Sequence, residues 1–356
     1  MPSLLIAFFF SFVATLLIIR FKHLHQTYSS DWDLSGPQKF HKKIVPRIGG
    51  VGIAIGLFTA ALIRLKSNPS DSTEIILLIC AVPTFAIGLT EDLTKKISVR
   101  LRLFVTAVSA GLVVYLLQVQ ITRLDIPVVD LLFSLPFFGI ALTIFAMTGL
   151  ANAYNIIDGF NGLASMVAII TLVAIAYVSF AVADPMLIFL SLIMAATILG
   201  FFVWNYPLGL IFLGDGGAYL IGFWIAALSI MLTYRHQEVS PWFSLLINGY
   251  PIIETLFTIY RRKIHQGKSP GQPDGIHFHT LIYRRILSRV HVSDKSYSAN
   301  ARTSPYLWFL TGVSVAPAIL FWGSTSALIF ANIAFLILYL WLYQKIINFK
   351  TPKWLS

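Results

Sequence analysis

The segment Asn152-Ala-Tyr-Asn155-Ile-Ile-Asp158-Gly-Phe-Asn161-Gly162 lies between two long apolar stretches and is the most informative part of the sequence. Its three amides and one carboxylate recur at every third residue. Polar side chains this close to membrane hydrocarbon are costly unless they bind something. The apolar flanks therefore predict two membrane-spanning helices, and the polar run predicts a ligand site where the two helices meet.

The composition extends this interpretation to the whole chain. Of its 356 residues, 57% are hydrophobic and 12% are charged, which is unusual for a soluble domain. We therefore predict an all-α fold, a polytopic transmembrane helical bundle that forms one integral membrane domain over residues 1–356. The only cysteine, Cys80, excludes a disulfide framework within one chain and a cysteine-based zinc site. About eleven spans are expected, at Leu4–Ile19, Gly49–Leu65, Ile75–Leu89, Leu103–Leu117, Leu131–Met147, Leu163–Val182, Met186–Val203, Ala218–Leu232, Trp242–Tyr260, Tyr306–Trp322 and Ala327–Tyr343.

Lysine and arginine predict the topology. No basic side chain precedes the first span, whereas Arg20 and Lys22 follow it, so the N-terminus is expected in the periplasm. Alternating sides then place the C-terminus in the cytoplasm and leave few basic residues outside, namely Arg64, Lys66, Arg123 and Arg235. The net charge of +11 is mainly this topology signal, and no basic domain is present that would bind nucleic acid. The expected cytoplasmic loops are about 20–48, 90–102, 148–162, 204–217 and 261–304, and they hold most of the unusual polar residues.

The first of these loops ends in cations followed by glycines. Lys43 and Arg47 precede Gly49 and Gly50 at the start of a span. Glycines let backbone N–H groups approach a phosphate and the cations neutralise it, which predicts phosphate binding. The alternative is that these basic residues only anchor the span end.

The second loop begins with two adjacent carboxylates, Glu91 and Asp92, at the end of an apolar span. Acids at a helix C-terminus oppose the helix dipole. The pair therefore predicts a metal or phosphate site, with Arg100 downstream holding phosphate. A capping role for this segment, through Thr90, is the alternative.

The third loop is the opening run. A spacing of three residues turns successive side chains by about 60° around a helix axis. Asn155 and Asp158 would be neighbours, while Asn152 and Asn161 would point in nearly opposite directions. One continuous helix therefore cannot aim all four at one ligand, and the glycines predict a break. The alternative is a helix-capping turn with satisfied amides.

The fourth loop contains one carboxylate among glycines, in Gly214-Asp215-Gly216-Gly217. A carboxylate in a glycine turn is a natural ligand for a hard cation. Asp215 can equally be the N-cap of the following helix.

The fifth loop contains Asp274, His277 and His279. Two histidines one residue apart point the same way if the segment is extended. Since no further zinc ligand has suitable spacing, a diphosphate or nucleotide is the better ligand. A solvated loop is the alternative.

Taken in order, these motifs resemble the polyprenyl-phosphate N-acetylhexosamine-1-phosphate transferases, the undecaprenyl-phosphate GlcNAc-1-phosphate transferase-like proteins. The matching segments are Pro46-Arg47-Ile48-Gly49-Gly50, Gly88 to Glu91-Asp92, Asn152 to Ala164, Gly214-Asp215-Gly216-Gly217 and Asp274 to His279. Four positions depart from the family pattern. Glu91 and Asn161 stand where aspartate is usual, Ala218 replaces a serine, and Thr280 replaces a third histidine.

The resemblance implies an enzyme that transfers HexNAc-1-phosphate from a UDP-sugar to polyprenyl (undecaprenyl) phosphate, releasing UMP. It implies an initiating step of a surface glycan such as O-antigen or capsule, in the bacterial inner membrane with the active site on the cytoplasmic face. It implies Mg²⁺ as cofactor, with Mn²⁺ as a substitute, on Asp215, and Asp92 as a second candidate ligand. Asp92, Asp158 and Asp215 would be catalytic. The expected substrate-binding residues are Lys43, Arg47, Glu91, Arg100, Asn152, Asn155, Asn161, Asp274, His277 and His279.

Two details of this expectation come from the residues themselves. A phosphate monoester is already mostly dianionic at neutral pH, so we expect Asp92 to position the lipid phosphate rather than deprotonate it. A transporter for an anionic solute would need ionisable residues in the middle of its spans, and these are missing apart from Glu254. Two more functions stay open, those of an intramembrane prenyltransferase and of a non-catalytic glycan-assembly subunit.

Overall fold

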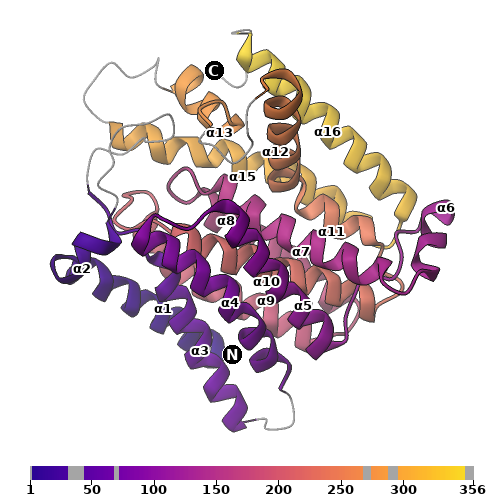
Figure 1. Ribbon diagram of the computed structural model, residues 1–356, viewed down its shortest axis with the longest axis horizontal. Coiled ribbons are helices and arrows are strands. Elements are labelled where there is room, and N and C mark those ends of the chain that lie inside the picture. Colours follow the sequence, from indigo (N-terminus) through magenta and orange to yellow (C-terminus); the bar gives the residue numbers. More distant parts are fainter. Residues whose placement is uncertain (1, 31–43, 68–71, 268–273, 288–295, 349–356) are drawn as a thin grey trace.

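The computed structural model describes residues 2–30, 44–67, 72–267, 274–287 and 296–348, and there every regular element is helical (Figure 1). One isolated bridge joins Ser30 and Pro46. The first half contains α1 (Pro2–Arg20), α2 (Lys22–Ser29), α3 (Gly49–Ser67), α4 (Thr73–Thr94), α5 (Val99–Leu117), α6 (Pro127–Asp130), η1 (Leu131–Ser134) and α7 (Phe138–Ile157). The second half contains α8 (Leu163–Ala181), α9 (Pro185–Asn205), α10 (Gly214–Arg235), α11 (Pro241–Ile247), α12 (Gly249–Tyr260), η2 (Arg261–His265), α13 (Phe278–Ile282), η3 (Tyr283–Leu287), α15 (Ser296–Leu320) and α16 (Thr325–Ile347).

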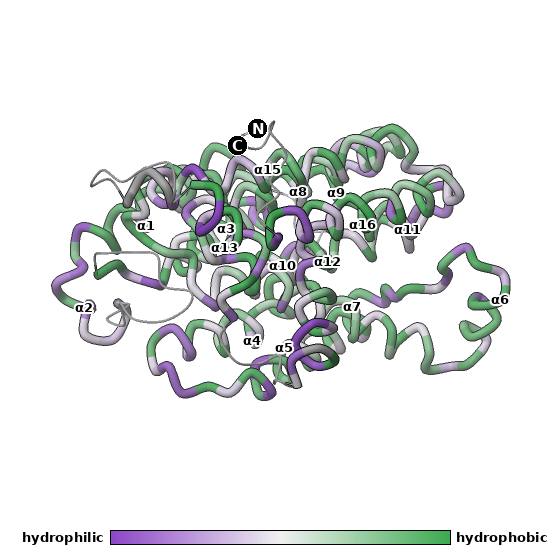
Figure 2. Tube along the Cα trace, turned by 90° about the horizontal axis from the view of Figure 1, so that it is seen from above, coloured by the Kyte–Doolittle hydropathy of each residue, from purple (hydrophilic) through white to green (hydrophobic). Residues whose placement is uncertain are grey.

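The number of spans agrees with the prediction. Among the described residues, ten helices are long and apolar enough to cross a membrane, and a bent pair makes an eleventh. The apolar outer surfaces of these helices, with side chains such as Phe58, Phe104 and Phe145 exposed, suit contact with lipid. In Figure 2 the helices are mainly hydrophobic along their length and the hydrophilic residues gather in connecting segments. The protein is therefore a multi-pass membrane protein.

The expected span Trp242–Tyr260 is not one straight helix. It consists of α11 and a second piece, Gly249–Ile264, which meet at an angle of 77°. Pro251 explains the break, because a proline has no N–H and its ring clashes with the carbonyl four residues earlier, at Ile247, where α11 ends. Asn248 lies at the bend, where its Oδ1 accepts a hydrogen bond from the Tyr154 hydroxyl at 3.2 Å.

Another span is displaced along the sequence. We expected Leu131–Met147 to be helical and 148–162 to be a loop, but α7 covers Phe138–Ile157. The predicted start was wrong because Pro136 falls inside the expected span and the residues before it form a short separate turn. The predicted end was wrong because Asn152 is satisfied within the helix, where its Oδ1 accepts the hydroxyl of Tyr219 at 3.0 Å. The break predicted beside the glycines is confirmed at residues 158–162.

The remaining expected loops are also shorter than predicted. The loop 90–102 shrinks to the residues between α4 and α5, and 204–217 ends where α10 begins at Gly214. Loop 20–48 contains α2, and loop 261–304 contains η2, α13, η3 and the start of α15. The end of α4 is an example of what hydropathy along one segment does not report, because Asp92 there accepts the N–H groups of Asp215 and Gly216 on α10.

Helix α10 lies at the centre of the bundle and is buried along almost its whole length (Figure 1). Glycines let α3 and α4 approach its first turn. A Cβ on Gly50 would come within 2.4 Å of the Gly217 Cα, and a Cβ on Gly88 within 2.7 Å of the Gly216 Cα. These glycines therefore bring three helix ends together.

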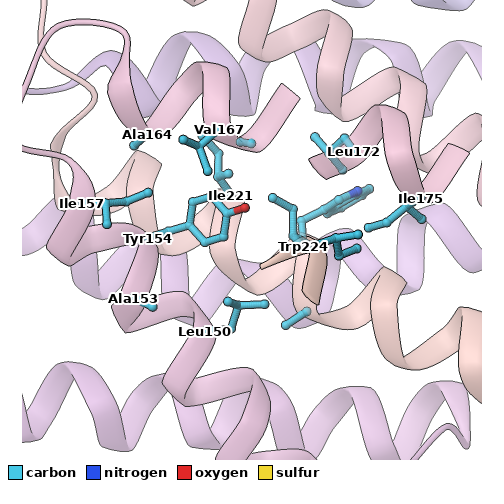
Figure 3. Packing of buried hydrophobic residues seen from close by; sticks show 14 of the residues in the cluster. Leu150, Ala153, Tyr154, Ile157, Ala164, Val167, Leu172, Ile175, Ile221 and Trp224 are labelled. Carbon is cyan, nitrogen blue, oxygen red and sulfur yellow. The ribbon is translucent and has the colours of Figure 1, made fainter. Parts of the chain in front are cut away.

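An apolar core holds α7, α8 and α10 in register. Figure 3 shows Tyr154 of α7 and Trp224 of α10 among aliphatic side chains of α8, including Val167 and Leu172. The polar atoms of both rings are satisfied, since the Trp224 indole donates to the Leu190 carbonyl at 3.1 Å and Tyr154 donates to Asn248. This packing fixes the end of α7 relative to the start of α10.

Candidate active site

The site is built around the N-terminus of α10. Asp92, at the end of α4, is buried and its two oxygens accept the backbone N–H groups of Asp215 and Gly216, both at 2.9 Å. The backbone N–H of Gly214 interacts with the carboxylate of Asp158. Two carboxylates from other helices thus satisfy N–H groups that a helix start leaves without partners. The expectation that Asp215 itself might cap α10 is wrong, because α10 begins before it and Asp92 supplies the cap.

Asp215 is left available for cations by this arrangement. Its Oδ1 lies 3.3 Å from Nη2 of Arg47, and its Oδ2 is bonded to Nη1 of Arg102. Arg47 also lies 3.4 Å from Asp92, and the Arg102 guanidinium stands 5.8 Å from the ring centroid of Tyr219. Two arginines from separate elements therefore meet on one carboxylate.

The segment that carries Arg47 is held against the start of α10. Phe212 N–H donates to the Pro46 carbonyl at 2.8 Å, and Gly49 N–H donates to the Phe212 carbonyl at 3.0 Å. Gly214 has φ +77°, and a Cβ there would come within 1.9 Å of the Arg47 carbonyl oxygen. The expectation that Gly49 and Gly50 present their N–H groups to a phosphate is wrong, because both groups are already bonded to carbonyls in this pairing.

Asn155 and Asp158 are the parts of the opening run that remain open to a ligand. Both are partly exposed, and Asn155 makes no side-chain hydrogen bond with the residues that the structure describes. Protein nevertheless packs around the Asp158 carboxyl group, and this desolvation raises its pKa to about 7 although Arg47 and the Gly214 N–H act in the opposite direction. Asp158 can therefore carry or accept a proton near neutral pH.

Asn161 has a scaffolding position. Its side-chain amide donates to the Pro207 carbonyl at 3.2 Å, and its backbone N–H donates to Asn300 at 3.0 Å. Ser304 donates to its carbonyl at 2.6 Å. A side chain facing a carbonyl oxygen needs a donor, which explains why an amide suits this position where the family usually has an aspartate.

The histidine pair lies directly on the same turn. The Nε2 atom of His279 would be 3.1 Å from a Cβ on Gly159, and its ring packs edge-on against Phe160 at 5.6 Å. The condition of an extended segment is not met, since α13 begins at Phe278, yet the rings of His277 and His279 do stack at 5.1 Å. Burial lowers the pKa of His279 to about 3, so this imidazole is neutral at physiological pH.

Asp274 anchors the start of the histidine segment. It bonds Arg261 and lies 3.6 Å from Arg262, both at the end of the bent span. Burial alone would raise the pKa of Asp274, but the Arg261 hydrogen bond and the charges of His277 and Arg261 hold it below its usual value. Asp274 is therefore bound to protein cations rather than open to substrate.

Comparison with known proteins fits this geometry. The family model described as glycosyl transferase family 4 matches residues 74–233, which include Asp92, Asp158 and Asp215. A Bacillus subtilis protein, named as a probable undecaprenyl-phosphate N-acetylglucosaminyl 1-phosphate transferase, is 31% identical over 254 residues, which cover 69% of this chain and 68% of its relative. The chain belongs to glycosyl transferase family 4.

Two further relatives of this family 4 transferase agree. Undecaprenyl-phosphate alpha-N-acetylglucosaminyl 1-phosphate transferases of Thermotoga maritima and Escherichia coli K12 are 28% and 29% identical. They match 71% and 69% of this chain, and the aligned parts cover 73% and 67% of the relatives. The resemblance drawn from the motifs is thereby confirmed, and the protein is an enzyme of the phospho-sugar transferase type.

Three predicted residues of the family 4 transferase are not brought into this cluster. Lys43 lies outside the described residues. Arg100 is exposed on the first turn of α5, and Glu91 accepts the backbone N–H of Ile97 at 2.7 Å, which closes the turn after α4. Glu91 thus has a local structural contact in this protein.

Sequence reasoning missed Arg102, which takes the place predicted for Arg100. Arg100 and Arg102 are two positions apart in α5, so their side chains point about 200° apart around the helix axis. Only one can face α10, and the sequence contains no signal that chooses between them. Glu254, noted only as an exceptional charge within a span, is also part of the assembly around His277.

Proposed function

We propose that this protein transfers an N-acetylhexosamine-1-phosphate from a UDP-sugar to undecaprenyl phosphate, giving the lipid-diphospho-sugar and UMP. The observation that carries this proposal is the meeting of five separate sequence motifs at the start of α10. Carboxylates, arginines, the open amide of Asn155 and histidines lie together there at the end of the spans, which suits a site for both a lipid phosphate and a soluble nucleotide-sugar. The names of the relatives support the acceptor lipid and the amino sugar.

The two arginines are the proposed diphosphate ligands. Arg47 and Arg102 converge on Asp215, and a phosphate offers guanidinium groups the same kind of bidentate partner as a carboxylate. When the nucleotide-sugar binds, these side chains can bond its phosphate oxygens and offset charge at the reacting phosphorus.

Asp215 fits a Mg²⁺ ion better than Asp92 does. The described residues contain no group of three or more His, Cys, Asp or Glu that could hold a metal without other ligands. Mg²⁺ usually takes one or two carboxylates together with substrate phosphates and waters, so such a cage is not required. Both Asp92 oxygens already accept backbone N–H groups, whereas Asp215 is held by side chains that can move to a substrate. A bound Mg²⁺ would supply charge stabilisation at the diphosphate.

The remaining roles follow from the contacts. Asp92 would position the start of α10 and, through it, Asp215, and a base is unnecessary because the lipid phosphate is already largely deprotonated. Asn155 and Asp158 would orient the nucleotide-sugar from the partly exposed turn. Neutral His279, together with His277, would border the diphosphate or uridine.

The basic residues support a cytoplasmic orientation for this end of the protein. They favour a periplasmic N-terminus and a cytoplasmic C-terminus in the bacterial inner membrane. The product would be the first lipid-linked sugar of a surface glycan such as O-antigen or capsule. A transporter function has no structural support, since its main candidate residue, Glu254, is hydrogen-bonded to His277 and Tyr339.

The test is a reaction of purified protein with undecaprenyl phosphate and each of several UDP-N-acetylhexosamines, with Mg²⁺, with Mn²⁺ and with chelator. UMP release that requires both lipid and divalent cation, with a matching lipid-linked sugar, is the expected result. Absence of a lipid product from every UDP-amino sugar would contradict the proposal. Uptake of the sugar into vesicles without a covalent product would favour a transporter instead.

A further inference from the structure

Glu254 is a buried carboxylate in the middle of the histidine assembly. It lies on α12, is 1% exposed and belongs to none of the motifs that define the site. Four groups donate to it: the His277 ring at 2.9 Å, the backbone N–H of Phe278 at 3.2 Å, the Tyr339 hydroxyl at 2.8 Å and the Thr258 hydroxyl at 3.4 Å. Glu254 therefore joins the bent span, the start of α13 and the C-terminal helix α16.

The bond to Glu254 determines which way His277 presents its ring nitrogens. A carboxylate oxygen can only accept, so the hydrogen on the 2.9 Å contact belongs to Nδ1 of His277. Nε2 is then turned away from Glu254 and lies 3.9 Å from the nearer oxygen of Asp274. The stacked ring of His279 covers one face of His277, at 5.1 Å, so the ring is also held against tilting.

Helix capping alone does not account for Glu254. One acceptor oxygen is enough for the single N–H of Phe278 that points at it. Glu254 offers two oxygens, and the one closest to His277 also receives Thr258 at 3.4 Å. A buried carboxylate is costly unless each oxygen is satisfied, and here the ring nitrogen is the partner that completes it.

We propose that Glu254 is a positioning residue that accepts the Nδ1–H of His277 and thereby fixes the orientation of this ring beside His279 at the candidate active site. This inference rests on the function proposed above and adds the group that sets the tautomer of one of its histidines. A carboxylate behind a histidine ligand is a common means of fixing ring orientation. The hydrogen bond from Tyr339 connects Glu254 to α16.

The first measurement is kinetic and uses Glu254→Gln. Glutamine keeps the size of the side chain but offers one acceptor oxygen to the four donors, so the bond to His277 Nδ1 is weakened. We expect KM for the UDP-sugar to rise about tenfold or more, as for other second-layer partners of functional histidines, while KM for undecaprenyl phosphate stays unchanged. In a His277→Asn background the same Glu254→Gln change should have no further effect on KM, because the histidine through which Glu254 acts has been removed.

The second measurement does not need turnover. Histidine labelled with ¹⁵N, with the His277 signal assigned by its loss in His277→Asn, reports which ring nitrogen carries hydrogen. In wild type, Nδ1 of His277 should carry a hydrogen, and Glu254→Gln should show a mixture of protonated and unprotonated Nδ1. Asp184→Asn is the matched control, since Asp184 is an equally buried carboxylate 2.9 Å from His236 at the other end of α10.

The outcomes separate this inference from the function itself. A wild-type protein that forms no lipid-linked sugar would contradict the proposed function, and the tautomer measurement would still decide the role of Glu254. An active wild type whose His277 carries its hydrogen on Nε2 would overturn the inference. So would an unchanged KM in Glu254→Gln, or an effect of equal size in the His277→Asn background, which would mean a general structural role.

Discussion

The two ends of α10 both carry buried carboxylates, but they use them differently. The helix has 22 residues, so its ends are about 33 Å apart. At the C-terminal end, Asp184 caps α9 by accepting the Leu187 N–H at 3.1 Å and also bonds Arg235 and His236 at the end of α10. One carboxylate therefore does both the capping and the charge pairing, and its bonds complete the local fold.

At the N-terminal end these two tasks are divided. Asp92 supplies the backbone contacts, and Asp215 meets Arg47 and Arg102, which come from other elements 168 and 113 positions away. Because Asp215 does not cap the helix, Arg47 and Arg102, which contact it, can also bind an incoming anion. A division of roles between two carboxylates, rather than burial or charge alone, therefore distinguishes the candidate active site from a structural ion pair.

Removal of one charge from each end is the strongest way to test this contrast. Asp215→Asn should lower turnover by roughly 10² to 10³, because it removes charge that the transition state uses. Asp184→Asn keeps a good capping residue and should leave kcat nearly unchanged. Lipid-linked product formation by both variants, with thermal unfolding as a folding check, is the measurement. Equal losses of turnover at the two ends would contradict the division of roles.

Arg102 can be tested against a neighbour on its own helix. Arg102→Ala should lower kcat/KM by roughly 10- to 100-fold, about 1.4 to 2.7 kcal/mol, since it removes one of two cations at Asp215. Arg100→Ala changes an exposed residue of the same type two positions away and should have little effect. Steady-state kinetics with varied UDP-sugar provide the comparison, and a larger effect at Arg100 would show that the assignment is reversed.

The close approach of α3 and α4 to the first turn of α10 should affect the thermal stability of the protein. Gly50→Ala places a Cβ 2.4 Å from the Gly217 Cα, and overpacking of this kind costs about 1–3 kcal/mol. Gly149→Ala on α7 meets nothing within 4 Å and should be neutral or slightly stabilising. Thermal midpoints in one detergent would compare them, and equal midpoints would mean that the helix ends are not tightly packed.

Acidification should affect the two ends in different ranges of pH. The pKa of His279 is about 3 in the fold against 6.5 for an ordinary histidine, so the unfolded chain binds a proton first as pH falls. Its stabilising contribution is complete above pH 6.5 and should shrink by about 1 kcal/mol between pH 6.5 and 5.5. The pKa of Asp184 is lowered from 3.8, because its bonds to His236, Leu187 and Arg235 outweigh its burial, so that contribution persists through this range.

The measurement is the stability of wild type and His279→Gln as a function of pH. The advantage of wild type over His279→Gln should decrease from pH 6.5 to 5.5, because the buried ring stays neutral while the ring in the unfolded chain gains a proton. A constant difference for His279→Gln would show that His279 is not buried as a neutral ring.

Several features were predictable from the sequence because they depend on local pattern. Long apolar stretches require internally bonded helices in a membrane, which gave the helical bundle and the number of spans. The carboxylates Asp92, Asp158 and Asp215 stood out because charged residues at span ends are unusual, and all three lie at the start of α10. The ends of α7 were misjudged, since a hydropathy pattern cannot show that Asn152 has a hydroxyl partner on α10.

The sequence alone determined which chemical groups are available and on which helix ends they lie, because residue type and helical spacing are local properties. Only the tertiary structure decided that Asp92 caps α10, that Arg102 rather than Arg100 meets Asp215, and that Asn161 supports the turn. Each of these choices depends on a partner tens to more than a hundred positions away. Packing selects such partners, through glycine contacts and buried hydrogen bonds that no single segment contains.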